Sequence, residues 1–161
     1  QSGPFYCPAD KKVYIDLSFL SQMKQMGAKG DFAYAYVIAH EVGHHISNIT
    51  GTLPKVHQAK RNLNKKQANQ LSVLLELQAD CYAGVWGYHA NNQQNILSEG
   101  DIEEGIRASQ AVGDDTLTKG RVHPDNFTHG TAKQRMSWFM QGMKTGKVES
   151  CNTFEQAGIR L

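Results

Sequence analysis

The chain has 161 residues, of which 40% are hydrophobic and 20% are charged, and its formal net charge at pH 7 is +2. This length favours one domain over residues 1–161, large enough to bury a core without a structural metal. The small net charge argues against nucleic-acid binding, and no apolar run reaches the 18 residues that a membrane-spanning helix needs. The basic stretch Lys55–Lys66 lacks interleaved aromatic residues, so we interpret it as the solvated face of a helix.

The first part of the chain predicts one strand followed by two helices. Polar and apolar residues alternate over Lys12–Leu17, which is the only pattern that clearly indicates a half-buried strand. Ser18 is a suitable cap for a short helix that extends to Met26. A longer helix begins with Asp31 as its N-cap, and its apolar residues recur every three or four positions through Ile46.

The rest of the chain is dominated by helical patterns. Residues 53–92 predict helix, with an interruption near 62–69 and a strongly apolar second half. A further helix is expected from residue 98 to about 113, followed by a loop over 113–130 and a last amphipathic helix over 131–143. We therefore expect a mainly α fold with a small edge strand or minimal sheet near the N-terminus.

The three cysteines show no CxxC spacing, which argues against a cysteine-based zinc site or a redox pair. Cys81 lies in an apolar helical run and is interpreted as a small buried hydrophobic residue. Cys7 and Cys151 lie in polar surroundings near the two ends, where a disulfide between them is one alternative in an oxidising compartment.

His40-Glu41-Val42-Gly43-His44 is an HExxH motif within a predicted helix. Residues four apart project from the same helical face, so His40 and His44 can share one tetrahedral metal ion. Zinc held in this way polarises a scissile carbonyl and acidifies its bound water, and Glu41 is the expected general base. The alternative to metal binding is a helix that carries two partly exposed histidines without a functional role.

A catalytic zinc needs a third protein ligand. The metzincin pattern is excluded because Ser47 and Thr50 occupy its glycine and histidine positions. Glu76 and Asp80 instead share one face of an apolar helix, and burying both carboxylates would be costly without positive or hydrogen-bonding partners. We predict Glu76 as the third ligand and Asp80 as the acceptor that holds the imidazole N–H of His40 or His44. Solvent-facing acids are the alternative.

The sequence resembles the bacterial neutral zinc metallopeptidases of the YpfJ-like family over nearly its whole length. The similarity is carried by five stretches: GPFYCP at residues 3–8, HEVGHH at 40–45, LELQADCYAGVW at 75–86, GDIEE at 100–104 and FTHG at 127–130. Thr131 and Ala132 depart from the serines expected after FTHG, so a role for hydroxyl groups there is not carried over.

This resemblance implies an α+β zincin-like fold with a gluzincin-type HExxH…ExxxD site, in which His40, His44 and Glu76 bind Zn²⁺ and Glu41 is the base. It also implies an extracytoplasmic catalytic domain, anchored in the inner membrane by an N-terminal segment. Family members typically have more chain before the GPFYCP stretch, often with another cysteine. The resemblance therefore implies an N-terminally truncated chain and, as the alternative to a Cys7–Cys151 bond, a Cys7 that has lost its partner.

Peptide hydrolysis also needs a donor that stabilises the oxyanion. His129, in the FTHG stretch, is our first expectation, with capping of the last helix or simple exposure as the alternatives. Three other residues remain open for this role, namely His123, Tyr36 and Arg135. His45, His57 and His89 are not expected to bind the metal.

The predicted partner is a peptide or protein substrate, and the sequence leaves the oligomeric state open. Two other functions remain. The domain could bind zinc through a fourth protein ligand and serve in interaction or regulation without catalysis. It could also use the activated water on a non-peptide amide or ester, because the motif specifies water activation and not the group attacked.

Overall fold

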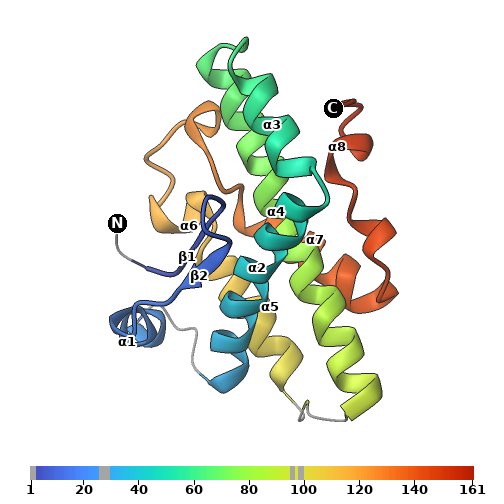
Figure 1. The fold of residues 1–161 in the computed structure, drawn as a ribbon. Coiled ribbons are helices and arrows are strands. Elements are labelled where there is room, and N and C mark those ends of the chain that lie inside the picture. The colour runs from blue at the N-terminus through green and yellow to red at the C-terminus, as the bar shows by residue number, and fades with distance from the viewer. Residues whose placement is uncertain (1–2, 26–29, 95–96, 98–99) are drawn as a thin grey trace.

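The computed structural model describes residues 3–25, 30–94, 97 and 100–161 (Figure 1). It confirms a mainly α fold with a minimal sheet near the N-terminus. The strands are β1 (Phe5–Cys7) and β2 (Lys12–Tyr14), and the helices are α1 (Ser18–Gln25), α2 (Asp31–Ile49), α3 (Thr52–Lys60), α4 (Lys65–His89), α5 (Asp101–Ala111), α6 (Asp114–Leu117), α7 (Ala132–Thr145) and α8 (Thr153–Gln156), with a π-helix over Ala90–Gln94 and 3₁₀-helices over Pro124–Asn126 and Val148–Cys151.

The sheet is an antiparallel hairpin in which Phe5 lies opposite Tyr14. The predicted strand over residues 12–17 ends at Tyr14, and its partner β1 was not predicted. Ile15 and Leu17 are 45% and 74% exposed, so their alternation with polar residues does not reflect burial. β1 is too short to show a period of two.

Helices α2, α4, α5 and α7 form the core. α4 packs against both α2 and α7, and α5 packs against the same two helices (Figure 1). The axes of α4 and α7 can approach closely because Gly142 has no Cβ atom, and a Cβ atom there would lie 2.0 Å from the carbonyl oxygen of Cys81. Tyr36 and Phe139 are almost fully buried in this core, with ring centroids 5.4 Å apart. The core thereby fixes α2 and α4, the two helices that carry the HExxH motif and Glu76.

Helix boundaries differ from the predicted ones in a few places. Gly30, not Asp31, is the N-cap of α2, and Asp31 is its first helical residue. The predicted interruption is confirmed as a break after α3, where Asn64 begins α4 with a capping box to Gln67. The predicted loop over 113–130 contains α6 and a 3₁₀-helix, and α8 was not predicted. The predicted boundaries at Met26 and Ser98 lie outside the described residues.

The disulfide between Cys7 and Cys151 considered from the sequence is not formed. Cys81 forms a disulfide with Cys151, whereas Cys7 is free. The bond joins α4 to the 3₁₀-helix that follows α7, and both cysteines are fully buried. Cys81 is therefore a cross-link and not only a small apolar residue. Sequence patterns gave no sign of the pairing because α7 brings together two residues that are 70 positions apart.

We expect reduction of the Cys81–Cys151 disulfide to lower the free energy of unfolding by about 4 kcal/mol, because opening a cross-link between residues so far apart restores chain entropy to the unfolded state. Urea denaturation with and without a reducing agent measures this difference. Cys7→Ser is the matched control and should leave stability unchanged. Equal stability of the oxidised and reduced protein would contradict the disulfide.

Candidate active site

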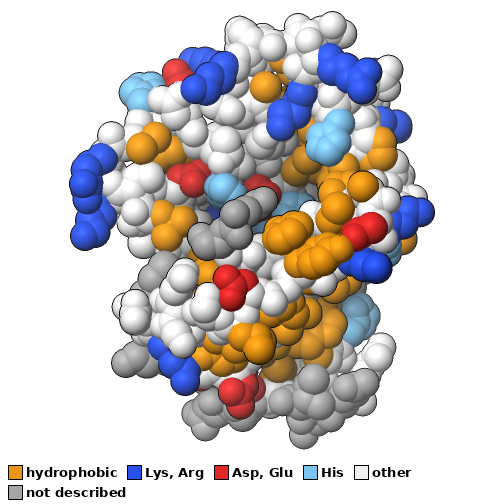
Figure 2. Space-filling view, turned by 60° about the vertical axis from the view of Figure 1, so that its left-hand side comes forward, with side chains coloured by type: hydrophobic (Ala, Val, Ile, Leu, Met, Phe, Trp, Pro, Cys, Tyr) orange, Lys and Arg blue, Asp and Glu red, His pale blue; other side chains and the backbone are white. Residues whose placement is uncertain are grey.

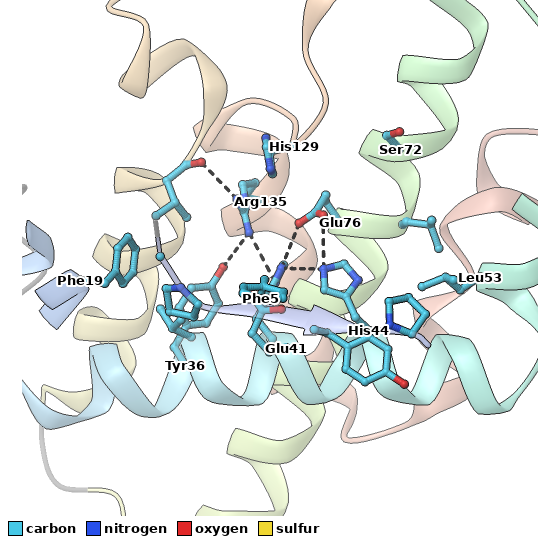
Figure 3. Close-up of a pocket in the computed structure, with 18 of the residues that line it drawn as sticks. Phe5, Phe19, Tyr36, Glu41, His44, Leu53, Ser72, Glu76, His129 and Arg135 are labelled. Carbon is cyan, nitrogen blue, oxygen red and sulfur yellow. Dashed lines mark hydrogen bonds and ion pairs between the residues drawn. The ribbon is translucent and has the colours of Figure 1, made fainter. Parts of the chain in front are cut away.

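Three side chains that could bind a metal meet between α2 and α4. His40 Nε2 lies 3.1 Å from His44 Nε2 and 3.0 Å from Glu76 Oε2. His44 Nε2 lies 3.3 Å from Glu76 Oε1. Each of the three residues offers one ligand atom, and these atoms all lie within 4.8 Å of one another. Figure 3 shows this group inside a pocket, with Glu41 beside it on α2.

These separations suit a zinc ion. Tetrahedral zinc with bonds of about 2.0–2.1 Å holds its ligand atoms about 3.3 Å apart. Two imidazoles and one carboxylate are also the donor set of a hydrolytic zinc site that keeps a position open. The three residues therefore fit zinc in both chemistry and spacing, and the remaining side of the site faces the cleft.

Asp80 orients the His40 ring through a hydrogen bond with the nitrogen that points away from His44 and Glu76. It accepts a hydrogen bond from His40 Nδ1 at 2.8 Å, which leaves Nε2 of the same ring facing His44 and Glu76. Asp80 is fully buried and also accepts hydrogen bonds from Tyr36 Oη on α2 and from Arg135 Nε on α7, the latter at 2.8 Å. Arg135 Nη2 donates a further bond to Asp80 at 3.1 Å. Every donor around this carboxylate comes from a packed helix.

The electrostatics of the group follow from this burial. Burial alone would raise the pKa of Asp80, but the charge of Arg135 and the contact with His40 lower it below its usual value. Burial also lowers the pKa of His40, yet Asp80 and Glu76 outweigh it and raise that pKa to about 10. Glu76 has a pKa well below the usual value because His44 and His40 overcome its burial. The two carboxylates are therefore anionic at neutral pH.

Glu41 lines the same pocket and is only 9% exposed. Burial raises the pKa of its carboxyl group, and the nearby His40 and His44 partly oppose that shift. No hydrogen bond within the described part of the chain engages this carboxylate. A carboxylate with a raised pKa is a better proton acceptor near neutral pH, so its surroundings suit a general base.

His129 lies on the side of the pocket opposite α2 (Figure 3). Its position is fixed by Asp114, the first residue of α6, whose Oδ2 accepts the backbone N–H groups of residues 128–130 at 2.8–3.1 Å. Asp114 Oδ1 also lies 3.3 Å from His129 Nδ1 and raises the pKa of the imidazole mainly through that hydrogen bond. Nε2, the other nitrogen of this half-exposed ring, is not engaged by Asp114, and the side chain lines the cleft.

The cleft has a volume of about 590 Å³. Figure 2 shows histidine and acidic side chains close together on this face, beside a group of hydrophobic side chains. Phe19 of α1 lies at one end of the pocket and Leu53 of α3 at the other, with Glu76 between them (Figure 3). The hairpin forms part of the wall, because Phe5 and Tyr6 line the pocket, and Tyr6 is hydrogen-bonded to His45 of α2 at 2.8 Å. The three ligand residues therefore lie in a cleft whose wall combines charged and apolar side chains.

The other histidines lie apart from the metal-binding cluster. His45 is tied to the hairpin, and His89 binds the carbonyl oxygen of Gly146 at 2.8 Å. His123 caps the 3₁₀-helix over Pro124–Asn126. His57 lines the cleft and is not among the three residues whose ligand atoms converge. Of the residues left open as oxyanion donors, Tyr36 and Arg135 instead surround Asp80 from inside the core, although both also border the cleft.

Sequence reasoning missed the structural importance of Arg135 and Asp114. Arg135 and Phe139 lie one turn apart on the buried face of α7, and an arginine on such a face needs a buried anion. That signal was present in the sequence. Asp114 gave none, because its partners are backbone groups and the His129 ring of a loop that only the fold brings back to α6.

A model of a protein family matches residues 1–154. The chain is 58% identical over 156 residues to "Uncharacterized protein YpfJ" of Escherichia coli strain K12, which covers 94% of the chain and 54% of the relative. It is 43% identical over 171 residues to "Uncharacterized protein Mb2605" of Mycobacterium bovis, which covers 98% of the chain and 57% of that protein. The chain thus spans about half the length of these relatives.

No solved structure matches the chain. Among the described residues, no helix has both the length and the hydrophobicity to span a membrane. The family match covers almost the whole sequence and agrees with the three ligand atoms that meet between α2 and α4. The protein therefore belongs to the family described as "Putative neutral zinc metallopeptidase".

Proposed function

We propose that the protein is a zinc-dependent peptidase in which His40, His44 and Glu76 hold the metal. The observation that carries this proposal is the meeting of three ligand atoms within 4.8 Å of one another, beside Glu41 and at the floor of a cleft. Family membership supports zinc as the metal and peptides or proteins as the substrates. The proposal concerns the domain, since the relatives are about twice as long.

Zinc, when bound, supplies Lewis acidity that polarises a substrate carbonyl and lowers the pKa of water. Glu41 accepts the proton of the attacking water and delivers it to the leaving amine, as its raised pKa allows. Asp80 holds the Nδ1 proton of His40, so Nε2 is the nitrogen that would bind the metal once it has released its own proton. Arg135 and Tyr36 in turn hold Asp80 in place.

His129 is proposed to stabilise the oxyanion. Asp114 fixes Nδ1 of this ring and favours its protonated form, in which both ring nitrogens are donors. The ring borders the cleft from the side opposite Glu41 (Figure 3). A donor on that side can approach the oxygen of the substrate carbonyl, while Glu41 accepts the proton of the attacking water on the opposite side.

The compartment is proposed to be extracytoplasmic. The buried Cys81–Cys151 disulfide supports this location, because disulfides persist in oxidising compartments such as the periplasm and are rare in the cytosol. Anchoring in the inner membrane by an N-terminal segment stays a prediction.

Removing one proposed ligand tests the metal site. We expect His44→Ala to weaken zinc binding by about 100-fold or more, because loss of a direct ligand should exceed the 10- to 100-fold effect of changing its supporting partners. His45→Ala is the matched control on the same helix and should retain one zinc ion per chain. Competition with a chelator of known affinity measures both variants. Equal zinc affinity of His44→Ala and wild type would contradict the assignment.

A further inference from the structure

One end of the cleft carries a lysine that is held in a fixed place. Lys60, the last residue of α3, is partly buried in the cleft wall, and its Nζ donates a hydrogen bond to Ser72 Oγ on α4. The Ser72 hydroxyl donates its own proton to the carbonyl oxygen of Ala68 at 3.2 Å. Ser72 therefore acts toward Lys60 as an acceptor only, which fixes the ammonium group against α4.

This ammonium group keeps unused donors. A lysine has three N–H donors, and one of them is engaged by Ser72. Within the described residues no carboxylate forms an ion pair with Lys60, whereas the nearby Lys66 pairs with Asp125 at 3.2 Å. Burial and the charge of Lys60 lower the pKa of His57, one turn earlier on α3, so this neighbouring imidazole is neutral at pH 7. The positive charge at this end of the cleft comes from Lys60.

The ammonium group of Lys60 lies about one helical turn along α4 from the proposed metal ligand Glu76. Ser72 and Glu76 are four residues apart on α4, which corresponds to about 6 Å along the helix. Figure 3 shows both side chains on this helix, with Ser72 further from His44 than Glu76 is. An extended peptide advances about 3.3–3.6 Å per residue, so a group bound at Lys60 lies about two residues from a peptide bond held at Glu76.

We propose that Lys60 and Ser72 form a subsite that binds a carboxylate of the peptide substrate, about two residues from the bond that is cleaved. The inference rests on the proposed function, since it takes the cleft as the place where a peptide binds. A carboxylate has oxygen atoms that can accept hydrogen bonds from the two N–H donors of Lys60 that Ser72 does not engage. The resulting hydrogen bonds are charge-assisted. It can be a free C-terminus or an acidic side chain, and the two sources require different peptides.

Fluorescence anisotropy on the zinc-loaded protein, with Glu41→Gln as background to keep peptides intact, measures the preference. The probes are labelled octapeptides of neutral residues. One has an amidated C-terminus, one has a free C-terminus, and an amidated set carries a single Glu at each position in turn. We expect a carboxylate-bearing probe to bind about tenfold more tightly than the neutral amidated peptide, as suits a partly exposed charge-assisted contact. The probe that gains affinity identifies the source.

Added Lys60→Met should abolish this preference, whereas added Lys55→Met, an exposed lysine on the same helix, should retain it. Lys60→Arg keeps the charge and should retain most of it, and circular dichroism checks that each variant is folded. Equal binding of all probes, or a preference that survives Lys60→Met, would overturn the subsite. Cleavage by wild type without any carboxylate preference would contradict the subsite alone. A Lys60-dependent preference without cleavage by wild type would contradict the proposed function and leave the subsite standing.

Discussion

Glu41→Gln should retain zinc and lower kcat for peptide cleavage by about 10²- to 10⁴-fold, the contribution that a general base typically makes. Glutamine has nearly the shape of glutamate but cannot accept the proton. The metal should stay because Glu41 is not among the three residues whose ligand atoms converge. Zinc content and single-substrate kinetics on the purified variant measure the two effects separately.

Glu103→Gln is the matched control, since Glu103 is an exposed acid on α5, away from the cleft. It should cleave at the wild-type rate. A Glu41→Gln enzyme within a few-fold of wild type would show that another group accepts the proton. Loss of zinc from this variant would instead place Glu41 in a role that supports the metal site.

Arg135→Met should lower the free energy of unfolding by about 3 kcal/mol, because it removes one of the two positively charged partners, Arg135 and His40, of a buried carboxylate. Asp80 is fully buried, and Arg135 supplies two of its hydrogen bonds. Urea denaturation of the zinc-free protein measures the loss without any contribution from the metal. Arg107→Met, at an exposed position on α5, should change stability by less than about 0.5 kcal/mol.

A double variant distinguishes an ion pair from simple loss of packing. If the cost arises from the stranded carboxylate, Arg135→Met combined with Asp80→Asn should be less destabilising than the sum of the single changes. Additive effects would mean that the two side chains stabilise the fold independently. Arg135→Met alone should also weaken zinc binding by about 10- to 100-fold, since Arg135 holds Asp80 and Asp80 orients His40.

The chemistry of the site could be predicted where it depends on local periodicity. His40 and His44 share a helical face, as do Glu76 and Asp80, and a spacing of four residues is enough to say so. An apolar helix that carries two acids also signals that they meet something positive. The structure places these two faces against each other, and both lie on long helices that the sequence pattern predicted.

Features that depend on distant parts of the chain could not be predicted in the same way. The Cys81–Cys151 bond and the Asp80–Arg135 pair each require α7 to pack along α4. Helical periodicity says which face of α7 is buried but not which helix covers it. β1 was missed for a different reason, since three residues contain too little pattern to indicate a strand.

Cleavage of a mixed peptide library by the purified wild-type protein, before and after removal of metal, shows whether peptide hydrolysis depends on the proposed zinc site. We expect the zinc-loaded protein to cleave peptides, a chelator to abolish cleavage, and one equivalent of zinc to restore it. Failure of the fully zinc-loaded, folded protein to cleave any peptide, or cleavage that persists without metal, would contradict the proposed function.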